Sequence, residues 1–265
     1  MLPTVVVGAA GALLGATTAR LAARSPLGVS MDRTNHAGLR VSLAEGPAYV
    51  VGAAAVAVFA GPAPVIATLG AGGFGAVDDF AGDSRSKGLK GHLGALAHGE
   101  VTTGALKILG IGATGLLAAW VADRGTDASL VSTLVGGAVI AGAANLGNLF
   151  DLRPGRALKV VVLTGAPMLL ARDATTRTAA AAAIGTALGL LPDDLAGRTM
   201  LGDTGANAAG ALVGTAYVGS VGLPGRLAAL SVLAGLTLAS EKVSFTKVIE
   251  STPVLRELDR LGRRG

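Results

Sequence analysis

The sequence predicts an all-α membrane protein, a polytopic transmembrane helical bundle of about nine spans, from three observations. Hydrophobic residues make up 51% and charged residues 15% of the 265 positions, which is too apolar for an ordinary soluble domain. Glycine contributes 41 residues and aromatics only 3%, and small side chains let helices approach closely in lipid. Apolar runs of roughly bilayer-spanning length recur along the chain. The absence of cysteine excludes disulfides, thiolate metal sites and a cysteine nucleophile.

The first apolar run, 2–19, is followed and not preceded by arginines. A cleavable signal peptide carries its positive charge first, so we expect a retained span with an outside N-terminus. Residues 25–45 then form a polar cytoplasmic loop. The stretch 43–80 is too long for one helix and contains the turn-forming cluster Gly61 to Pro64, which predicts two spans separated at that cluster.

Six further spans complete the count of nine, and two of them, 157–171 and 178–191, are short for a bilayer. The remaining four are 103–122, 128–149, 206–222 and 225–241. The alanine run at 179–183 is interpreted as helix-forming only. We therefore expect one integral membrane domain over residues 1–241, followed by a basic amphipathic tail at 242–265.

The positions of the charged residues provide a check on this span count. The C-terminal ends of odd-numbered spans and the N-terminal ends of even-numbered spans must lie on the same side of the membrane. On this count 18 basic residues lie inside and four outside, which accounts for all 22 lysines and arginines. The four outside residues are Arg124, Arg172, Arg177 and Arg226. This asymmetry supports the span number and predicts an inside C-terminus through the positive-inside rule. We expect the protein to lie in the plasma membrane. Membrane orientation explains the calculated pI near 10.0 better than nucleic-acid binding does.

Two adjacent carboxylates, Asp78 and Asp79, close the third apolar run. An ionisable group at membrane depth is unfavourable by at least about 2.5 kcal/mol, so such residues usually face a polar cavity, a cation or a substrate. Neighbouring helical positions point about 100° apart, which lets one acid hold a metal while the other faces a reacting group. A competing interpretation is a solvated helix end neutralised by Arg85, Lys87 and Lys90.

Two further polar motifs lie at helix ends, NLGNLFD at 145–151 and GDTG at 202–205. Each has a structural alternative: Asp203 can cap a helix, and the asparagines can hydrogen-bond between helices. On the nine-span count, however, all of these motifs face the cytoplasm. Four carboxylates and two amides around one cavity form an oxygen-rich site, which suits Mg²⁺ shared with a substrate diphosphate.

Together these residues resemble the polyprenyl-phosphate N-acetylhexosamine-1-phosphate transferases, which include the enzyme that makes the first lipid intermediate of peptidoglycan. Asp78 and Asp79 match the family's acid pair after the third helix, and 145–151 matches its N-x-x-N-L-x-D motif. Residues 202–205 match its G-D-T-G motif before the eighth helix, and 33–48 is similar to its first cytoplasmic loop. The resemblance covers most of the chain.

The resemblance implies an enzyme, a phosphoglycosyl transferase that moves a sugar phosphate from a UDP-sugar to a membrane polyprenyl phosphate and releases UMP. Mg²⁺ is the implied cofactor, held by Asp203 together with Asp79. Asp78 then orients or deprotonates the lipid phosphate. The nucleotide side is assigned to Asn148 and Asp151. Further substrate contacts are expected from Lys107, on the cytoplasmic half of the fourth span, and from His36, with Lys87 and Lys90 as weaker candidates.

The C-terminal tail departs from the family, whose last cytoplasmic loop carries a histidine cluster after a proline. Here Pro253 is followed by arginines, with Arg256 first, and no histidine lies beyond His98. Asp151 also lacks the glycine that follows it in the family, and the family's final helix has no counterpart before Gly265. Arginine binds phosphate in a bidentate fork, so we expect Arg256 to contact the donor. The alternative is an amphipathic tail whose arginines face anionic lipid.

Two other function classes stay open from the sequence. A non-catalytic relative would act as a membrane scaffold or lipid-phosphate-binding partner in envelope assembly. A transporter with an acid site at the membrane midplane is weaker, because the acids lie at helix ends and no internal repeat is detectable. A homodimer is also left open as an assembly state.

Overall fold

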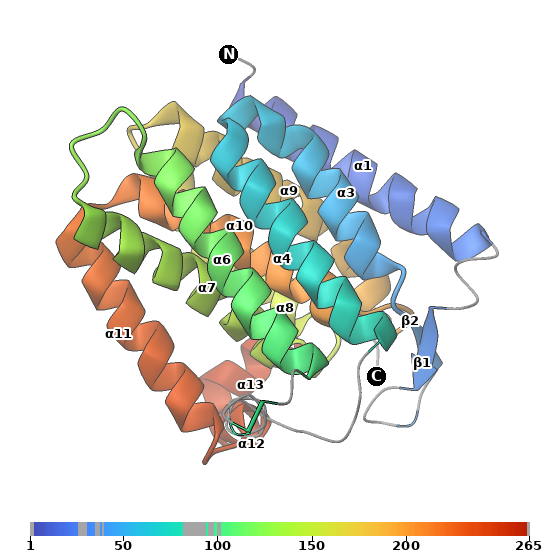
Figure 1. Cartoon of the computed structure of the whole chain (residues 1–265). Helices are drawn as coiled ribbons and strands as arrows, with labels where there is room; N and C mark the ends of the chain where they lie inside the picture. Colours follow the sequence, from blue (N-terminus) through green and yellow to red (C-terminus); the bar gives the residue numbers. More distant parts are fainter. Residues whose placement is uncertain are drawn as a thin grey trace.

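The computed structural model describes residues 3–25, 31–34, 38, 40–81, 94, 98–99 and 102–263. In this part of the chain the fold is a helical bundle with one small β-hairpin (Figure 1). The long helices are α1 (Thr4–Arg24), α3 (Glu45–Ala57), α4 (Pro62–Ala81), α6 (Thr103–Asp123), α7 (Leu130–Phe150), α9 (Ala174–Leu195), α10 (Gly202–Ser220) and α11 (Leu223–Ser240). The shorter elements are α8 (Arg156–Gly165), α12 (Phe245–Ser251), α13 (Pro253–Arg260) and the 3₁₀ helices η1 (Val58–Ala60) and η2 (Ala166–Leu170). The predicted all-α class is confirmed.

Each of the nine predicted spans overlaps a described helix, and local signals explain several boundaries. The predicted break in 43–80 is confirmed, because η1 ends at Ala60 and α4 begins at Pro62. Gly61 between them has a φ of 98°, a left-handed conformation that glycine adopts without strain. The fixed φ of Pro62 suits the first turn of a helix. At the start of α6, the Thr102 hydroxyl accepts a hydrogen bond from the Ala105 backbone N–H.

Four of the described helices, α1, α6, α7 and α11, are long and apolar enough to cross a membrane. The segment formed by α3 and η1 is apolar but shorter. Helix α8 has 10 residues, which corresponds to about 15 Å and half of a hydrocarbon layer of about 30 Å. The four apolar helices therefore carry the membrane character of the fold.

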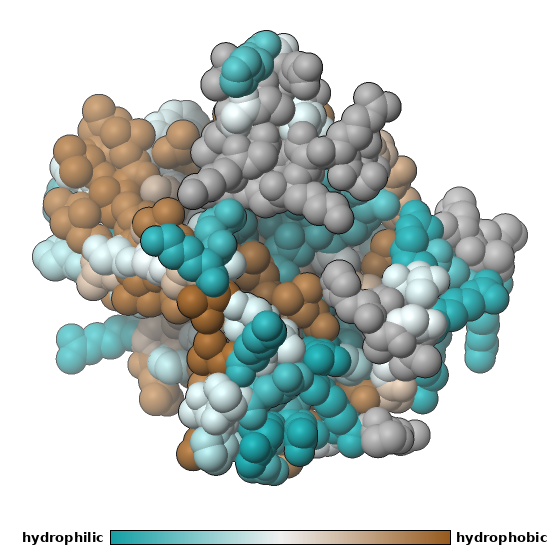
Figure 2. All heavy atoms as spheres, turned by 90° about the horizontal axis from the view of Figure 1, so that it is seen from below, coloured by the Kyte–Doolittle hydropathy of each residue, from teal (hydrophilic) through white to brown (hydrophobic). Residues whose placement is uncertain are grey.

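Helix α10 occupies the middle of the bundle, surrounded by α3, α4, α7, α8 and α9 (Figure 1). Nearly all of its side chains are buried, including Asn207. Its first turn carries the GDTG motif, so the packing of this helix fixes where Asp203 lies. The lower end of the bundle in Figure 1 also carries α12, α13 and the hairpin. Seen from that end in Figure 2, hydrophilic side chains gather beside hydrophobic ones.

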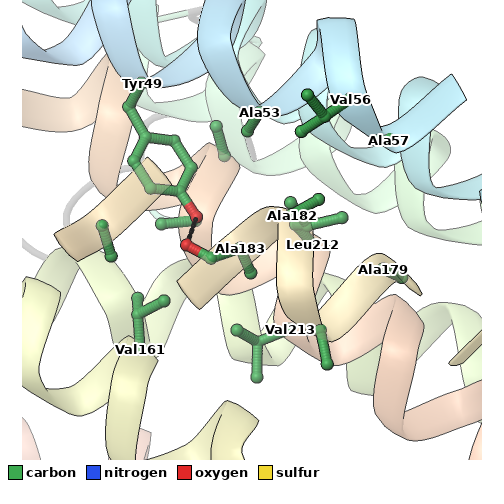
Figure 3. Close-up of a cluster of buried hydrophobic side chains, with 14 of the residues drawn as sticks. Tyr49, Ala53, Val56, Ala57, Val161, Ala179, Ala182, Ala183, Leu212 and Val213 are labelled. Atoms are coloured by element: carbon green, nitrogen blue, oxygen red, sulfur yellow. Dashed lines mark hydrogen bonds between the residues drawn. The ribbon is translucent and has the colours of Figure 1, made fainter. Parts of the chain in front are cut away.

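The core beside α10 is built largely from alanines (Figure 3). All five residues of the alanine run 179–183 on α9 are buried, so this run forms a packing surface as well as a helix. The hydroxyl of Tyr49 on α3 donates a 3.2 Å hydrogen bond to the Ala183 carbonyl oxygen. Small side chains bring the helix backbones close together, and the resulting dispersion contacts hold the bundle rigid.

The expectation that residues 25–45 form only a polar loop was incomplete. Strands β1 (Asp32–Thr34) and β2 (Arg40–Ser42) pair antiparallel, with Arg33 opposite Val41. Ser42 in turn exchanges backbone hydrogen bonds with the segment before α10, accepting one from the Met200 N–H at 3.0 Å. This long-range pairing positions the hairpin next to the GDTG turn, and no local sequence pattern predicts it.

The C-terminal tail folds into α12 and α13 and docks against the start of α8. Arg156 of α8 donates two hydrogen bonds to the Asp259 carboxylate, at 2.7 and 3.0 Å, and both side chains are buried. The opposite side of the tail exposes apolar residues, with Val254 at 70% and Leu261 at 67% exposure. The tail is therefore amphipathic, with its buried polar contacts directed towards the bundle.

Candidate functional site

Asp79 of the acid pair binds the start of α10. Its carboxylate accepts hydrogen bonds from the backbone N–H of Asp203 at 2.9 Å, the N–H of Thr204 at 2.8 Å and the Thr204 hydroxyl at 2.6 Å. The capping group of α10 thus comes from another helix, 124 residues earlier in the chain. Both oxygens of Asp79 are engaged, so its position identifies it as the residue that holds the GDTG turn.

Two glycines make this contact possible. A side chain at Gly75 on α4 would place its Cβ 2.2 Å from the Asp203 carbonyl oxygen, so only glycine allows α4 to approach the turn. Gly202 has a φ of 59°, and a Cβ there would lie 3.0 Å from both carboxylate oxygens of Asp79. The glycines of the motif therefore serve close backbone approach and a left-handed turn.

Asp78 and Asp203 meet at the ammonium group of Lys107. The Lys107 Nζ donates to Asp78 Oδ2 at 2.6 Å and also to Asp203 Oδ2. The side chains of these three residues are only 17 to 23% exposed. Two carboxylates from α4 and α10 thus share one lysine from α6.

Asn148 and Asp151 lie at the C-terminal end of α7, next to the same turn. The Asp151 carboxyl is buried, and its Oδ2 has no hydrogen-bond partner in the described residues. Burial, together with the negative charge of Asp194, raises its pKa well above the usual range, although a hydrogen bond from the Gly202 backbone opposes this. Asn145 differs, because its amide donates to the Thr237 hydroxyl on α11 and so joins two helices.

The acid pair, Asp203, Asn148 and Asp151 line one cavity of about 790 Å³, whereas Lys107 and Asn145 do not. Its polar lining includes Asp78, Asp79, Asn148, Asp151, Asp194, Thr199, Asp203, Arg33, Thr34, Arg153 and Arg263. The predicted convergence of Asp78, Asp79, Asp151 and Asp203 on one cleft is therefore confirmed. The cavity is rich in carboxylates, and its arginines come from the hairpin, the α7–α8 connection and the C-terminal tail.

Sequence reasoning missed two buried acids beside this cavity. Glu45, at the start of α3, is fully buried and neither of its carboxylate oxygens has a hydrogen-bond partner among the described residues. Asp194 lines the cavity, and its Oδ2 is likewise unpartnered. In the sequence, Glu45 stands at the start of one apolar segment and Asp194 at the end of another. Acids in these places are also typical of solvated helix ends. Their burial depends on packing between distant helices.

The C-terminal tail places Arg263 at the cavity, and not Arg256 as expected. Arg256 does not line the cavity, and its nearest charged partner is the neighbouring Glu257 at 3.5 Å. Arg263 lines the cavity instead, held by Asp259 at 2.8 Å and by a hydrogen bond to the Pro154 carbonyl oxygen at 2.8 Å. Because Asp259 is fixed by Arg156, the docking of the tail determines the position of Arg263.

His36, Lys87 and Lys90 lie outside the described residues, as do Arg85 and Arg264. His98 is described and exposed, and it is not among the cavity residues. The substrate contacts expected from the first three therefore stay predictions.

The acids can accommodate a divalent cation of the kind that binds with substrate phosphates. No group of three or more acidic or histidine side chains is arranged to enclose a metal ion in the described part of the chain. Mg²⁺, however, commonly uses one or two carboxylates and completes its shell with water and phosphate oxygens. Asp78 and Asp203 already share one cation, Lys107, and so fit this mode. Asp79, expected as a ligand together with Asp203, is instead engaged by the α10 backbone.

A second cavity, of about 630 Å³, lies between α7, α8, α10 and α11 and is lined almost wholly by apolar residues. It adjoins the first along two helices. Gly147 lines the apolar cavity and Asn148 the polar one, and Ala206 lines the apolar cavity one turn after Asp203. The chain therefore places an acidic cavity beside an apolar one.

Comparison with known proteins adds no relative to this description. No protein-family model matches the chain, and no curated protein matches it significantly.

Proposed function

We propose that this protein transfers a sugar-1-phosphate, of the N-acetylhexosamine type, from a UDP-sugar to polyprenyl phosphate, releasing UMP. The proposal includes membership of the polyprenyl-phosphate N-acetylhexosamine-1-phosphate transferases and a role in cell-envelope glycan synthesis. The observation that carries it is the convergence of the acid pair, the α7 motif and the GDTG turn on one cavity. The adjoining apolar cavity supports a substrate that combines a phosphate with a hydrocarbon chain.

The chemistry requires positioning more than a strong base. An oxygen of the lipid phosphate forms a bond to the β-phosphorus of the donor, and the bond from that phosphorus to UMP breaks. A phosphate monoester is already largely ionised at pH 7, so its attack needs alignment and charge neutralisation. Bound Mg²⁺ supplies neutralisation of the donor diphosphate. The enzyme therefore needs acids that hold a cation and cations that face phosphate, and the cavity offers both.

The roles of individual residues follow from their contacts. Asp203 and Asp78, which both contact the Lys107 ammonium, are assigned to the metal. Asp78 also orients the lipid phosphate. Asp79 positions Asp203 through the turn that it caps. The donor nucleotide is assigned to Asn148 and Asp151.

The proposed orientation places the cavity on the cytoplasmic face of the plasma membrane, with nine spans, the N-terminus outside and the C-terminus inside. The distribution of basic residues supports it. Because the chain has no cysteine, single cysteines at Thr126 and Arg260 can be labelled selectively. We expect Thr126→Cys to react from outside and Arg260→Cys only after permeabilisation, and the reverse pattern would overturn this orientation.

Release of UMP by the purified full chain tests the function. The assay combines Mg²⁺, polyprenyl phosphate and a panel of UDP-sugars. We expect Asp203→Asn to lower turnover at least about 100-fold, because it removes a charge that holds the metal. Asp127→Asn is the matched control, since Asp127 is exposed and is not among the cavity residues.

The opposing outcome favours a different function. If the wild-type protein releases no UMP from any donor, the non-catalytic alternative holds, in which the chain is a membrane scaffold or binds lipid phosphates for an envelope assembly.

A further inference from the structure

Lys107 occupies an unusual position among the charged groups of the cavity. It lies on α6, and its ammonium group contacts carboxylates from two other helices, Asp78 of α4 and Asp203 of α10. Its side chain is 17% exposed, and the residue itself is not among those that line the cavity. The ammonium thus lies behind the two carboxylates and neutralises them from within the protein.

The charge of the neighbouring Asp79 is stabilised by hydrogen bonds and not by a cation. Its three hydrogen bonds come from the Asp203 and Thr204 backbone and the Thr204 hydroxyl. A backbone N–H group cannot leave without unwinding the first turn of α10. A lysine side chain can, because its four-carbon stem rotates freely and its charge is a compact point. Asp78 and Asp203 are therefore the two acids whose counter-charge can be exchanged.

We propose that Lys107 is a built-in counter-cation that competes with Mg²⁺ for Asp78 and Asp203 and turns to the donor diphosphate when the metal binds. The competition depends only on the contacts of these three residues, whereas the diphosphate step rests on the proposed transferase function. With both carboxylates ionised, the three side chains carry one net negative charge. A divalent ion added to the same carboxylates gives a net positive charge, with two cations within a few ångströms of each other.

Like charges at this separation repel, and the effect is strong in a site sheltered from water. The ammonium must therefore move, or the metal binds weakly. A diphosphate beside the carboxylates resolves the conflict, since its oxygens accept hydrogen bonds from the displaced ammonium and also complete the metal shell. The metal and the diphosphate should consequently each strengthen the binding of the other, by the same factor.

Metal binding to the purified full chain tests the competition directly, with Mn²⁺ as a spectroscopic probe of free and bound ion. We expect Lys107→Met, whose unbranched side chain is one atom shorter and carries no charge, to tighten Mn²⁺ binding at least tenfold in the absence of nucleotide. Lys107→Arg, which keeps the charge, should bind Mn²⁺ within about threefold of the wild type. Lys247→Met is the matched control, because Lys247 is exposed and is not among the cavity residues.

The same measurements with UDP present provide the second arm. In the wild type, UDP should tighten Mn²⁺ binding, and Lys107→Met should reduce this coupling at least fivefold. Unchanged or weaker Mn²⁺ binding by Lys107→Met would overturn the competition, and so would an absence of Mn²⁺ binding to both the wild type and the variant.

A measurement on the unmodified side chain keeps the proposal testable if the variants do not fold. Acylation of Lys107 by an amine reagent, followed by mass spectrometry, should become several-fold faster on addition of Mn²⁺, because the metal displaces the ammonium. An unchanged rate would overturn the proposal. If Lys107→Met tightens Mn²⁺ binding but no donor yields UMP, the competition stands and the transferase function fails.

Discussion

Helix α6 carries one buried charge cluster near each of its ends, and the two clusters are neutralised in different ways. At its C-terminal end, Asp123 receives two hydrogen bonds of 2.7 Å from Arg226 of α11. Thr133 of α7 donates a third, also at 2.7 Å, and Arg226 further donates to two backbone carbonyls. One acid thus meets one guanidinium, and both carboxylate oxygens are engaged, while the Arg226 Nε has no hydrogen-bond partner among the described residues.

The other cluster lies 16 positions earlier on α6, a distance of about 24 Å along the helix. There Lys107 contacts both Asp78 and Asp203, while Asp151, Asp194 and Glu45 nearby retain oxygens without hydrogen-bond partners among the described residues. In that part of the chain the acids outnumber the cations that contact them. Asp78, Asp151, Asp194 and Asp203 line a cavity, whereas Asp123 and Arg226 fill the space between three helices.

The difference separates a structural ion pair from a binding site. A buried charge that is fully paired locks helices together, and its energetic value depends on keeping both partners. Buried acids without enough partners lower the stability of the fold, and such residues persist where a ligand supplies the missing charge. By this criterion the cavity end is the candidate ligand site, whereas the opposite end maintains the packing of α6, α7 and α11.

The largest expected effect on stability comes from breaking the closed pair. Arg226→Met should lower the free energy of unfolding by about 3–5 kcal/mol, because it leaves the Asp123 carboxylate buried without a counter-charge. Thermal or denaturant unfolding of the purified protein measures this loss. The paired change Asp123→Leu with Arg226→Met should recover most of it, and an equal loss in the double variant would contradict the assignment of a simple ion pair.

A smaller effect should separate the two adjacent acids at the cavity. Asp79→Ala removes the cap of α10 and should cost about 1–2 kcal/mol of stability, in the range of other helix caps. Asp78→Ala should change stability by less than about 0.5 kcal/mol, because Lys107 keeps Asp203 as its partner. The same unfolding assay compares the two variants. Equal losses would argue against a capping role that is specific to Asp79.

The smallest effect concerns pH. The folded pKa of Asp151 is raised, so the folded state binds more protons than the unfolded state above about pH 4, and stability falls as pH rises towards that folded pKa. Asp151→Asn should remove this dependence and stabilise the protein at neutral pH. The pKa of Asp259 is instead lowered, chiefly by Arg156 acting against its burial. Its contribution is present above about pH 4 and is lost as pH falls through the folded pKa.

Melting curves of both variants between pH 3 and 8 test these opposite signs. Asp259→Asn should flatten the acid side of the stability profile, and Asp151→Asn the side above about pH 4. A profile that is unchanged by Asp151→Asn would mean that this carboxyl has the same pKa in the folded and the unfolded protein, and would contradict the raised folded pKa.

The sequence by itself determined where the helices lie and which end of the bundle carries the acids. Local chemistry decides such features: the length of an apolar run, a Gly–Pro break at 61–62, and the alternation that brings the ends of odd spans and the starts of even spans together.

The tertiary structure alone decided what each acid does. Asp78 and Asp79 are neighbours, and the rotation of α4 about its axis determines which one caps α10 and which one meets Lys107. That rotation depends on contacts such as Gly75 against Asp203, and the choice of Arg263 over Arg256 depends on Asp259 docking against Arg156. The contact of Arg156 with Asp259 joins residues 103 positions apart, and that of Asp79 with Asp203 joins residues 124 positions apart, so helical periodicity and local propensity carry no information about them.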